Sequence, residues 1–166
     1  MMKRSQLARS HTLAVLVENK SGVLARVAGL FARRGFNIES LAVAPTDERF
    51  SRITIVVDAE SAPIDQIRKQ LDKLIDVVAI TELEAEASAL REMVLVRLDV
   101  PDTSKVAEVE ALVAGFSGSV IRVRDTQMMI SLSSDPSDLD DLLNQLEPFG
   151  VQELQRTGAI AIPGIE

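Results

Sequence analysis

One short segment carries the residue types of a small-ligand site: Asn19, Lys20, Ser21, Gly22, Val23 and Leu24. It lies between an expected strand and an expected helix. A helix N-terminus presents unpaired N–H groups and a positive dipole end, which bind a carboxylate without any charged side chain. Glycine lets the backbone approach a ligand closely, and the aliphatic pair that follows could line a pocket. The same pattern is also explained if Asn19 and Ser21 cap the helix and Gly22 makes a turn.

A second candidate segment runs from Gly35 to Leu41. Asn37 is a polar residue at the opening of an apolar strand, followed by Ile38. Exposure on an edge strand or a bulge explains this polar position as well as ligand binding does. The apolar alternation slips at Glu39 and Ser40, which predicts a bulge.

The residue types give little support for disulfides, metal binding or catalysis. The chain has no Cys and a single His, His11, which excludes disulfides, thiolate sites and multi-His metal sites. The acidic group at 138–141 opens a predicted helix, where the dipole favours carboxylates. There is no phosphate loop, dinucleotide glycine pattern or nucleophile elbow. We therefore expect neither a catalytic residue nor a metal ligand in this chain.

Hydrophobic periodicity predicts the order β-α-β-β-α-β twice. The first set has strands at 11–17, 36–44, 52–58 and 76–83, with helices beginning near Val23 and Pro63. The second has strands at 92–99, 119–124, 127–133 and 151–162, with helices after Ser104 and from Asp135–Pro136. The fold class is therefore α+β, with two tandem ferredoxin-like units, each a four-stranded antiparallel sheet with two helices on one face.

The domain boundaries follow from this pattern. We expect a tail at 1–10, a first domain at 11–83, a connector with helical propensity at 84–91 and a second domain at 92–166. Each unit has about 70 residues, which is near the lower limit for an independent core. Each also leaves one sheet face and its edges uncovered, so we expect the chain to pair with another copy in an oligomer.

Composition and charge narrow the class of partner. The 166 residues are 46% hydrophobic and 26% charged, as in ordinary globular proteins. Residues 1–83 carry 12 Lys and Arg against 10 Asp and Glu, whereas residues 84–166 carry 6 against 15. An acidic half argues against nucleic acid, and an RNA-binding unit of this order would need sheet aromatics where this chain has no Tyr or Trp. Without a signal-peptide or membrane-length apolar run, we expect a cytoplasmic protein with no membrane contact.

Several strings resemble the small regulatory subunit of acetohydroxyacid (acetolactate) synthase, whose first domain is an amino-acid-sensing ACT domain. The strings are Glu18–Val27, Leu30–Leu41, Val43–Thr46, Ser51–Val56, Gln66–Val77 and Arg91–Glu92. The resemblance is strong over 11–99 and diffuse over 100–166, where Arg156–Thr157–Gly158 is kept. Family members often carry a basic stretch after that point, whereas this chain ends without one.

The resemblance implies a non-catalytic regulatory subunit of branched-chain amino acid biosynthesis. Its catalytic partner uses thiamine diphosphate, Mg and FAD, and the small subunit raises that enzyme's activity and confers allosteric feedback inhibition by valine, sometimes by isoleucine or leucine. The effector site lies between two ACT domains of a homodimer. Carried over to this chain, the loop Asn19 to Leu24 of one copy takes the ligand, while Asn37 and Ile38 of the other copy close the site. The alternative is an ACT-domain sensor that acts on another enzyme or on a transcription factor.

Overall fold

The computed structural model describes residues 10–58 and 63–165, and these fall into two compact units. We call residues 10–90 with 159–165 the N-terminal unit, and residues 91–158 the C-terminal unit. The two units are described separately below.

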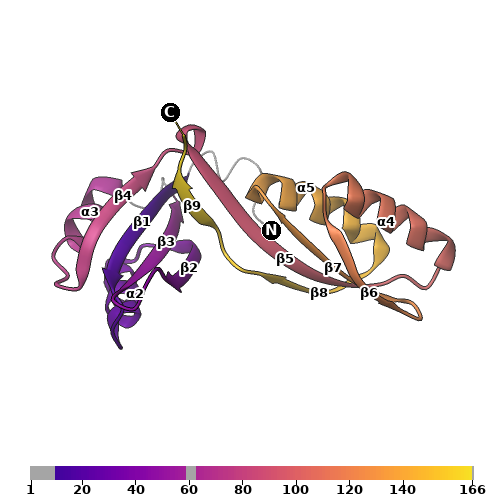
Figure 1. The fold of residues 1–166 in the computed structure, drawn as a ribbon, viewed down its shortest axis with the longest axis horizontal. Helices are drawn as coiled ribbons and strands as arrows, with labels where there is room; N and C mark the ends of the chain where they lie inside the picture. Colours follow the sequence, from indigo (N-terminus) through magenta and orange to yellow (C-terminus); the bar gives the residue numbers. More distant parts are fainter. Residues whose placement is uncertain (1–9, 59–62, 166) are drawn as a thin grey trace. The chain divides into compact units, whose positions relative to one another are not determined.

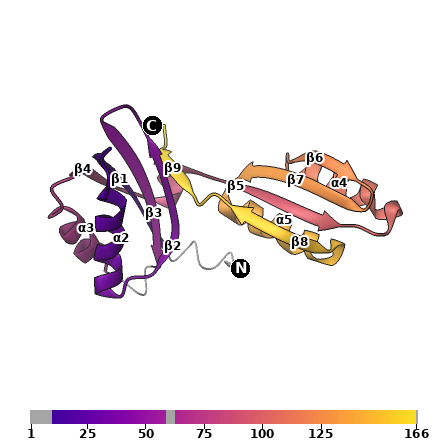
Figure 2. The same cartoon turned by 90° about the horizontal axis from the view of Figure 1, so that it is seen from below.

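The N-terminal unit has the predicted β-α-β-β-α-β order. Its elements are β1 (Ser10–Glu18), α2 (Val23–Arg34), β2 (Ile38–Pro45), β3 (Phe50–Asp58), α3 (Ile64–Leu71) and β4 (Val77–Leu83). The strands form an antiparallel sheet in the order β2-β3-β1-β4. Both helices lie on one side of this sheet (Figures 1 and 2). The prediction of an ACT-like ferredoxin fold is confirmed.

Alternation along the strands builds the core between sheet and helices. The buried apolar residues of this core are Leu13, Val15, Val17, Val23, Val27, Leu30, Phe31, Ile53, Ile55, Val57, Ile67 and Leu71. The helix α2 ends at Gly35, which takes the left-handed conformation (φ 69°) that glycine tolerates best. The predicted bulge is confirmed, because the register of β2 against β3 shifts between Ile38 and Ser40.

On the opposite face of this sheet, the central strands carry some short side chains, and the chain's own C-terminal segment packs against them. Ala14 and Thr54, which pair across β1 and β3, are both buried on this face. The strand β9 (Ile160–Pro163) brings Ala161 into a cluster with Ala14, Leu83 and Leu90. The short side chains let the two layers approach closely, so the segment completes a second, smaller core.

Backbone groups fix the same segment at both ends. The Ala159 N–H donates to Ser40 Oγ on β2 at 2.8 Å, and the Gly164 N–H donates to the Ala87 carbonyl at 2.7 Å. β9 also pairs with β5 (Ser88–Asp99). The C-terminal segment is thus held by hydrogen bonds as well as by apolar contact.

Two expectations about these regions are wrong. The single strand expected at 151–162 is two strands, β8 (Val151–Arg156) and β9, with Gly158 between them at φ 82°. As a result, residues 159–165 pack in the N-terminal unit rather than with the residues before them. The connector with helical propensity expected at 84–91 is shorter than predicted, because it holds only a 3-10 turn (Ala85–Ala87) and β5 already begins at Ser88. Apolar alternation identifies a strand, but it does not say which sheet that strand joins.

The C-terminal unit repeats the order of elements. It contains residues of β5, then α4 (Val106–Gly115), β6 (Ser119–Arg124), β7 (Gln127–Ser134), α5 (Pro136–Leu146) and β8. Short 3-10 turns precede α4 (Thr103–Lys105) and follow α5 (Glu147–Phe149). The sheet order is β6-β7-β5-β8, with α4 and α5 on one side (Figures 1 and 2). The predicted start of α5 is confirmed, since the Asp135 carboxylate accepts from the Ser137 N–H at 3.0 Å and Pro136 takes the first helical position.

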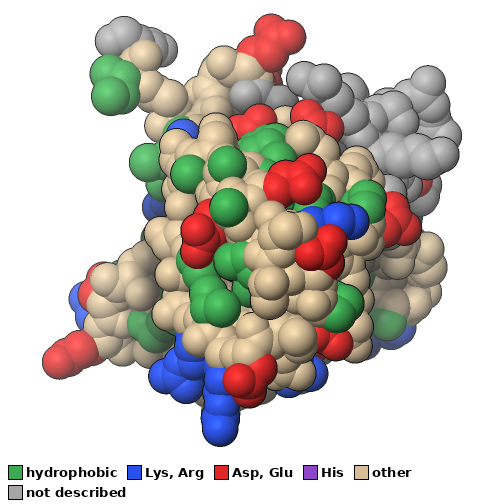
Figure 3. All heavy atoms as spheres, turned by 90° about the vertical axis from the view of Figure 1, so that its right-hand side faces the viewer, with side chains coloured by type: hydrophobic (Ala, Val, Ile, Leu, Met, Phe, Trp, Pro, Cys, Tyr) green, Lys and Arg blue, Asp and Glu red, His purple; other side chains and the backbone are tan. Residues whose placement is uncertain are grey.

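Alternate residues of β5 face opposite sides of this second sheet. Val94, Val96 and Leu98 are buried beneath the helices, whereas Met93 and Leu95 on the other face remain exposed. In the part of this unit that faces the viewer in Figure 3, red acidic side chains are scattered among green hydrophobic ones, and blue Lys and Arg gather mainly at the lower edge. In the described residues, no helix has both the length and the apolarity needed to cross a membrane.

The packing of β9 predicts the effect of a charge at Ala161, which is 4% exposed. Ala161→Glu places an unpaired carboxylate against Ala14 and Leu83, and we expect it to lower the free energy of unfolding by about 2 kcal/mol or more. Ile162→Glu is the matched control, because its side chain is 56% exposed; its effect should stay within about 0.5 kcal/mol. Urea unfolding followed by circular dichroism measures both, and equal stabilities would refute the role of β9.

Candidate functional site

The segment Asn19 to Gly22 forms the connection between β1 and α2, and all four of its residues are exposed. Asn19 fixes this loop to the neighbouring strand. Its N–H donates to the Arg49 carbonyl at 2.8 Å, and its side-chain oxygen accepts from the Ser51 hydroxyl at 3.1 Å. Lys20 forms an ion pair with Glu18 at 2.6 Å. The loop is therefore anchored at its first residue and open to solvent beyond it.

The helix α2 begins without a side-chain cap. Gly22 occupies the N-cap position at φ 82°, and no side chain accepts a hydrogen bond from the first turn. The interpretation of Asn19 and Ser21 as caps is therefore wrong, because Asn19 binds Ser51 instead. The left-handed conformation explains why glycine stands here. The first N–H groups of an α-helix have no acceptors within it, so this end of α2 can receive an anion.

The two aliphatic residues after Gly22 have different environments. Val23 is 4% exposed and belongs to the main core, whereas Leu24 is 43% exposed. Val23 therefore anchors the start of the helix. Of the pair, Leu24 is the residue whose side chain a ligand in this loop can contact.

An ion pair beside the loop was not foreseen from the sequence. Arg26 Nε and Nη2 each lie 2.7 Å from Asp76 Oδ2. Asp76 is 7% exposed, and its carbonyl accepts from the Glu18 N–H at 2.9 Å, so it sits where β1 ends and β4 begins. Sequence periodicity places Arg26 off the buried face of α2 but gives no sign of a partner fifty residues away.

The second predicted segment lies at the other end of α2. Asn37 is exposed just after the helix stop at Gly35, and Ile38 begins β2 and packs partly against the main core. The helix between Gly22 and Gly35 has 12 residues, which corresponds to a length of about 18 Å. Within one chain, the structure does not bring Asn37 or Ile38 to the loop at Gly22.

Glu39 is a partly buried acidic residue next to that segment. Burial raises the pKa of its carboxyl, and the nearby Asp58 raises it further. One carboxylate oxygen is buried without a hydrogen-bond partner among the described residues. The charged form of Glu39 is therefore disfavoured in the folded chain.

Several other charged groups form ion pairs away from the loop at Gly22. In the C-terminal unit, Arg156 binds Glu92 at 2.6 Å and Asp140 at 2.7 Å, and both carboxylates are buried. Desolvation lowers the pKa of Arg156, but the two acidic partners outweigh it and raise the pKa overall. His11 lies 3.1 Å from Glu82 on the adjacent strand. Among the described residues, no three His, Asp or Glu side chains are grouped to hold a metal ion.

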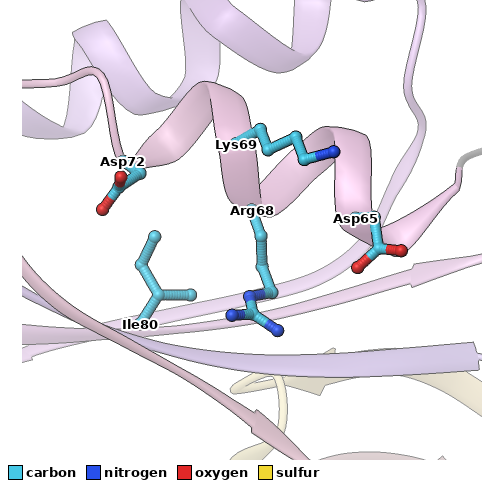
Figure 4. Close-up of a pocket in the computed structure, with 5 residues that line it drawn as sticks. All are labelled: Asp65, Arg68, Lys69, Asp72 and Ile80. Atoms are coloured by element: carbon cyan, nitrogen blue, oxygen red, sulfur yellow. The ribbon is translucent and has the colours of Figure 1, made fainter.

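One open pocket of about 260 Å³ lies between α3 and β4 (Figure 4). Its lining residues are Asp65, Arg68, Lys69, Asp72 and Ile80. Figure 4 shows Arg68 extending from α3 toward the strands, with Asp65 and Asp72 on either side of it. None of the residues predicted to bind an effector lines this pocket, and its balanced charges favour no particular ligand.

Comparison with known proteins gives concordant results for both halves. Residues 13–79 match the family described as the AHAS small subunit-like ACT domain, and residues 91–164 match the small subunit of acetolactate synthase. The chain is 45% identical over 154 residues to the acetolactate synthase small subunit of Mycolicibacterium smegmatis, covering 92% of this chain and 90% of that protein. It is 42% identical to a probable acetolactate synthase small subunit of Archaeoglobus fulgidus, over 92% and 95% of the two chains.

A solved structure agrees with these sequence matches. The crystal structure of an acetolactate synthase small subunit from Thermotoga maritima superposes with a TM-score of 0.86 at 35% identity. The match covers 95% of this chain and 99% of that one. The likeness therefore extends through both units rather than through the first alone.

The environment of Glu39 predicts a pH dependence of stability. Because the folded pKa is raised, the folded chain holds this proton more tightly than the unfolded chain. The stability that the proton contributes is complete below the ordinary pKa of 4.5 and is lost as the pH rises through the folded pKa. We expect Glu39→Gln to unfold at a higher temperature than wild type at pH 7 and at nearly the same temperature near pH 4. A constant difference across this range would contradict the assignment.

Proposed function

The chain belongs to the family of acetolactate synthase small subunits, and on that premise we propose that its N-terminal unit is a valine-type effector sensor shared by two copies. A small subunit of this family is regulatory and non-catalytic, and its partner is the large catalytic subunit. In the proposal, the effector binds at a homodimer interface, and the small subunit both stimulates the catalytic subunit and transmits feedback inhibition in branched-chain amino acid biosynthesis. Thiamine diphosphate, Mg and FAD belong to the catalytic partner.

The observation that carries the proposal is the separation of the two predicted segments. Gly22 and Asn37 lie at opposite ends of α2, about 18 Å apart along its axis. A single amino acid is too short to bridge that distance. If both segments bind the same effector, they must come from different copies of the chain.

The sheet supplies an edge that can bring them together. β2 pairs with β3 on one side and is the terminal strand of its sheet. Asn19 binds Ser51, and Ser51 lies opposite Pro45, so the loop sits near the Pro45 end of β2. Ile38 begins the other end of that strand.

Two copies related by a two-fold axis would align their β2 strands in opposite directions. In that arrangement, Ile38 of one copy lies beside the Pro45 end of the other, close to the other copy's loop. The pairing also removes an exposed sheet edge, which proteins commonly protect. The proposed homodimer and the proposed two-chain site therefore follow from one arrangement.

The chemistry of the loop fits a free aliphatic amino acid. Its carboxylate would bind the uncapped N–H groups at the start of α2, and its ammonium group would meet the side-chain oxygens of Asn19 or Asn37 or backbone carbonyls. Leu24 and Ile38 would contact the aliphatic side chain. One methylene changes such a contact by about 1–3 kcal/mol, so valine, leucine and isoleucine should differ in affinity by moderate factors.

Regulation requires that effector binding favour one arrangement of the dimer over another. Coupling between sites typically amounts to about 1–3 kcal/mol. The alternative function, a sensor for another enzyme or for a transcription factor, has no observation in its favour, because residues 91–164 also match the acetolactate synthase small subunit.

Gly22→Asp tests the loop. The new carboxylate repels the ligand carboxylate, and its Cβ would stand 3.2 Å from Arg26 Nη1 on backbone at φ 82°. We expect valine inhibition of the reconstituted enzyme to be lost while stimulation of the catalytic subunit persists. Acetolactate formation with increasing L-valine measures both. An inhibition curve like that of wild type would exclude this loop from the site.

Asn37→Ala tests the second segment and the two-chain geometry together. Loss of one hydrogen-bonding side chain should weaken effector affinity by about tenfold, measured by calorimetric titration with L-valine.

Mixed dimers of Gly22→Asp and Asn37→Ala chains give a sharper result. If each site uses two copies, one of the two sites in a mixed dimer is intact and about half of the binding capacity returns. If one chain supplied the whole site, mixing would restore none.

A further inference from the structure

Arg26 presents an unused nitrogen to the loop at Gly22. Its Nε and Nη2 both bind Asp76 Oδ2 at 2.7 Å. Its Nη1 lies 3.2 Å from the position that a Cβ on Gly22 would occupy. In the part of the chain that the structure describes, no hydrogen bond occupies this third nitrogen, and the side chain is 47% exposed.

Asp76 holds the guanidinium in a defined orientation. The carboxylate is nearly buried, and the hydrogen bond from the Glu18 N–H to the Asp76 carbonyl ties the residue to the end of β1. A guanidinium is planar, so fixing its Nε and Nη2 edge also fixes the direction of Nη1. The entropy that a long flexible side chain would lose on binding a ligand is therefore largely lost already on folding.

The charge of the ligand gives this nitrogen a role. A helix N-terminus supplies about half a positive charge, which leaves part of a carboxylate's charge without compensation. The other cation of the loop, Lys20, is already paired with Glu18 at 2.6 Å. Arg26 is thus the cation placed to share an anion with the first turn of α2.

We propose that Arg26 is a further effector-binding residue, which binds the α-carboxylate of the amino acid through Nη1 while Asp76 positions it. This inference rests on the proposed effector site and extends it to a residue outside the two predicted segments. It makes the free carboxylate, rather than the aliphatic side chain, the group that Arg26 recognises. An amino acid amide has no carboxylate, so Arg26 adds nothing to its binding affinity.

The test compares L-valine with L-valinamide, which keeps the ammonium and side chain but replaces the carboxylate with a neutral amide. Calorimetric titrations use the full chain, with and without catalytic subunit. We expect Arg26→Gln to weaken L-valine binding by about tenfold or more, as for loss of a charge-assisted hydrogen bond, and to leave L-valinamide binding unchanged or slightly stronger. Arg68→Gln on α3, also an exposed arginine of the same unit, should change neither affinity.

The outcomes separate this inference from the proposed function. If Arg26→Gln weakened both ligands equally, Arg26 would only support the fold, and the inference would be overturned while the effector site stood. Unchanged L-valine binding would overturn it as well. If wild type bound no branched-chain amino acid even with catalytic subunit, the sensor proposal would fall together with this inference. Thermal unfolding checks that each variant folds. If Arg26→Gln does not fold, Arg26→Lys replaces it, because lysine keeps the positive charge but lacks the planar guanidinium.

Discussion

Two helices can cover only one face of a four-stranded sheet. The second face and the edges of the sheet must be covered by other means, and much of this structure serves that purpose. In the N-terminal unit, α2 and α3 bury the face that carries Leu13, Val15 and Val17. On the other face, the C-terminal segment packs against Ala14 and Leu83. The terminal strand β2 is the edge at which we propose that a second copy binds. The chain itself thus covers part of the second face, and in the proposal a second copy covers the edge.

The sequence predicted the elements well because their signals are local. The period of Val23, Val27, Leu30 and Phe31 predicts α2, and the slip at Glu39 and Ser40 predicts the bulge. The destination of β9 was missed because an apolar alternation looks the same whichever sheet it joins. The turn at Gly158 that redirects the chain depends on its φ of 82° and on the receiving surface of Ala14 and Leu83. Neither is visible in a short stretch of sequence.

In the candidate site, too, the local features were predicted and the long-range contacts were not. The position of Gly22 at the start of α2 was predicted from the sequence, and the structure places it there. The sequence left open whether Asn19 and Ser21 cap this helix, and in the structure no side chain does. The pairing of Arg26 with Asp76 was not predicted, because it joins residues of distant segments at the end of the sheet. Family resemblance supplied Asn37 and Ile38, and the length of α2 is the physical reason why, in the proposed site, they belong to another copy. The sequence therefore predicts which short segments carry binding groups, whereas the contacts between distant segments depend on the topology of the fold.

The position of the C-terminal segment also has a consequence for how the protein is made. A ribosome synthesises residues 10–90 well before residues 159–165, so the N-terminal unit emerges with its Ala14 and Thr54 face still bare. Its four strands and two helices can assemble during translation, but that face cannot be closed until the whole C-terminal unit has also left the ribosome. The N-terminal unit is therefore complete only after the chain has been translated through both units. A nascent or prematurely terminated chain would carry an exposed sheet face, the kind of surface that chaperones and proteases recognise.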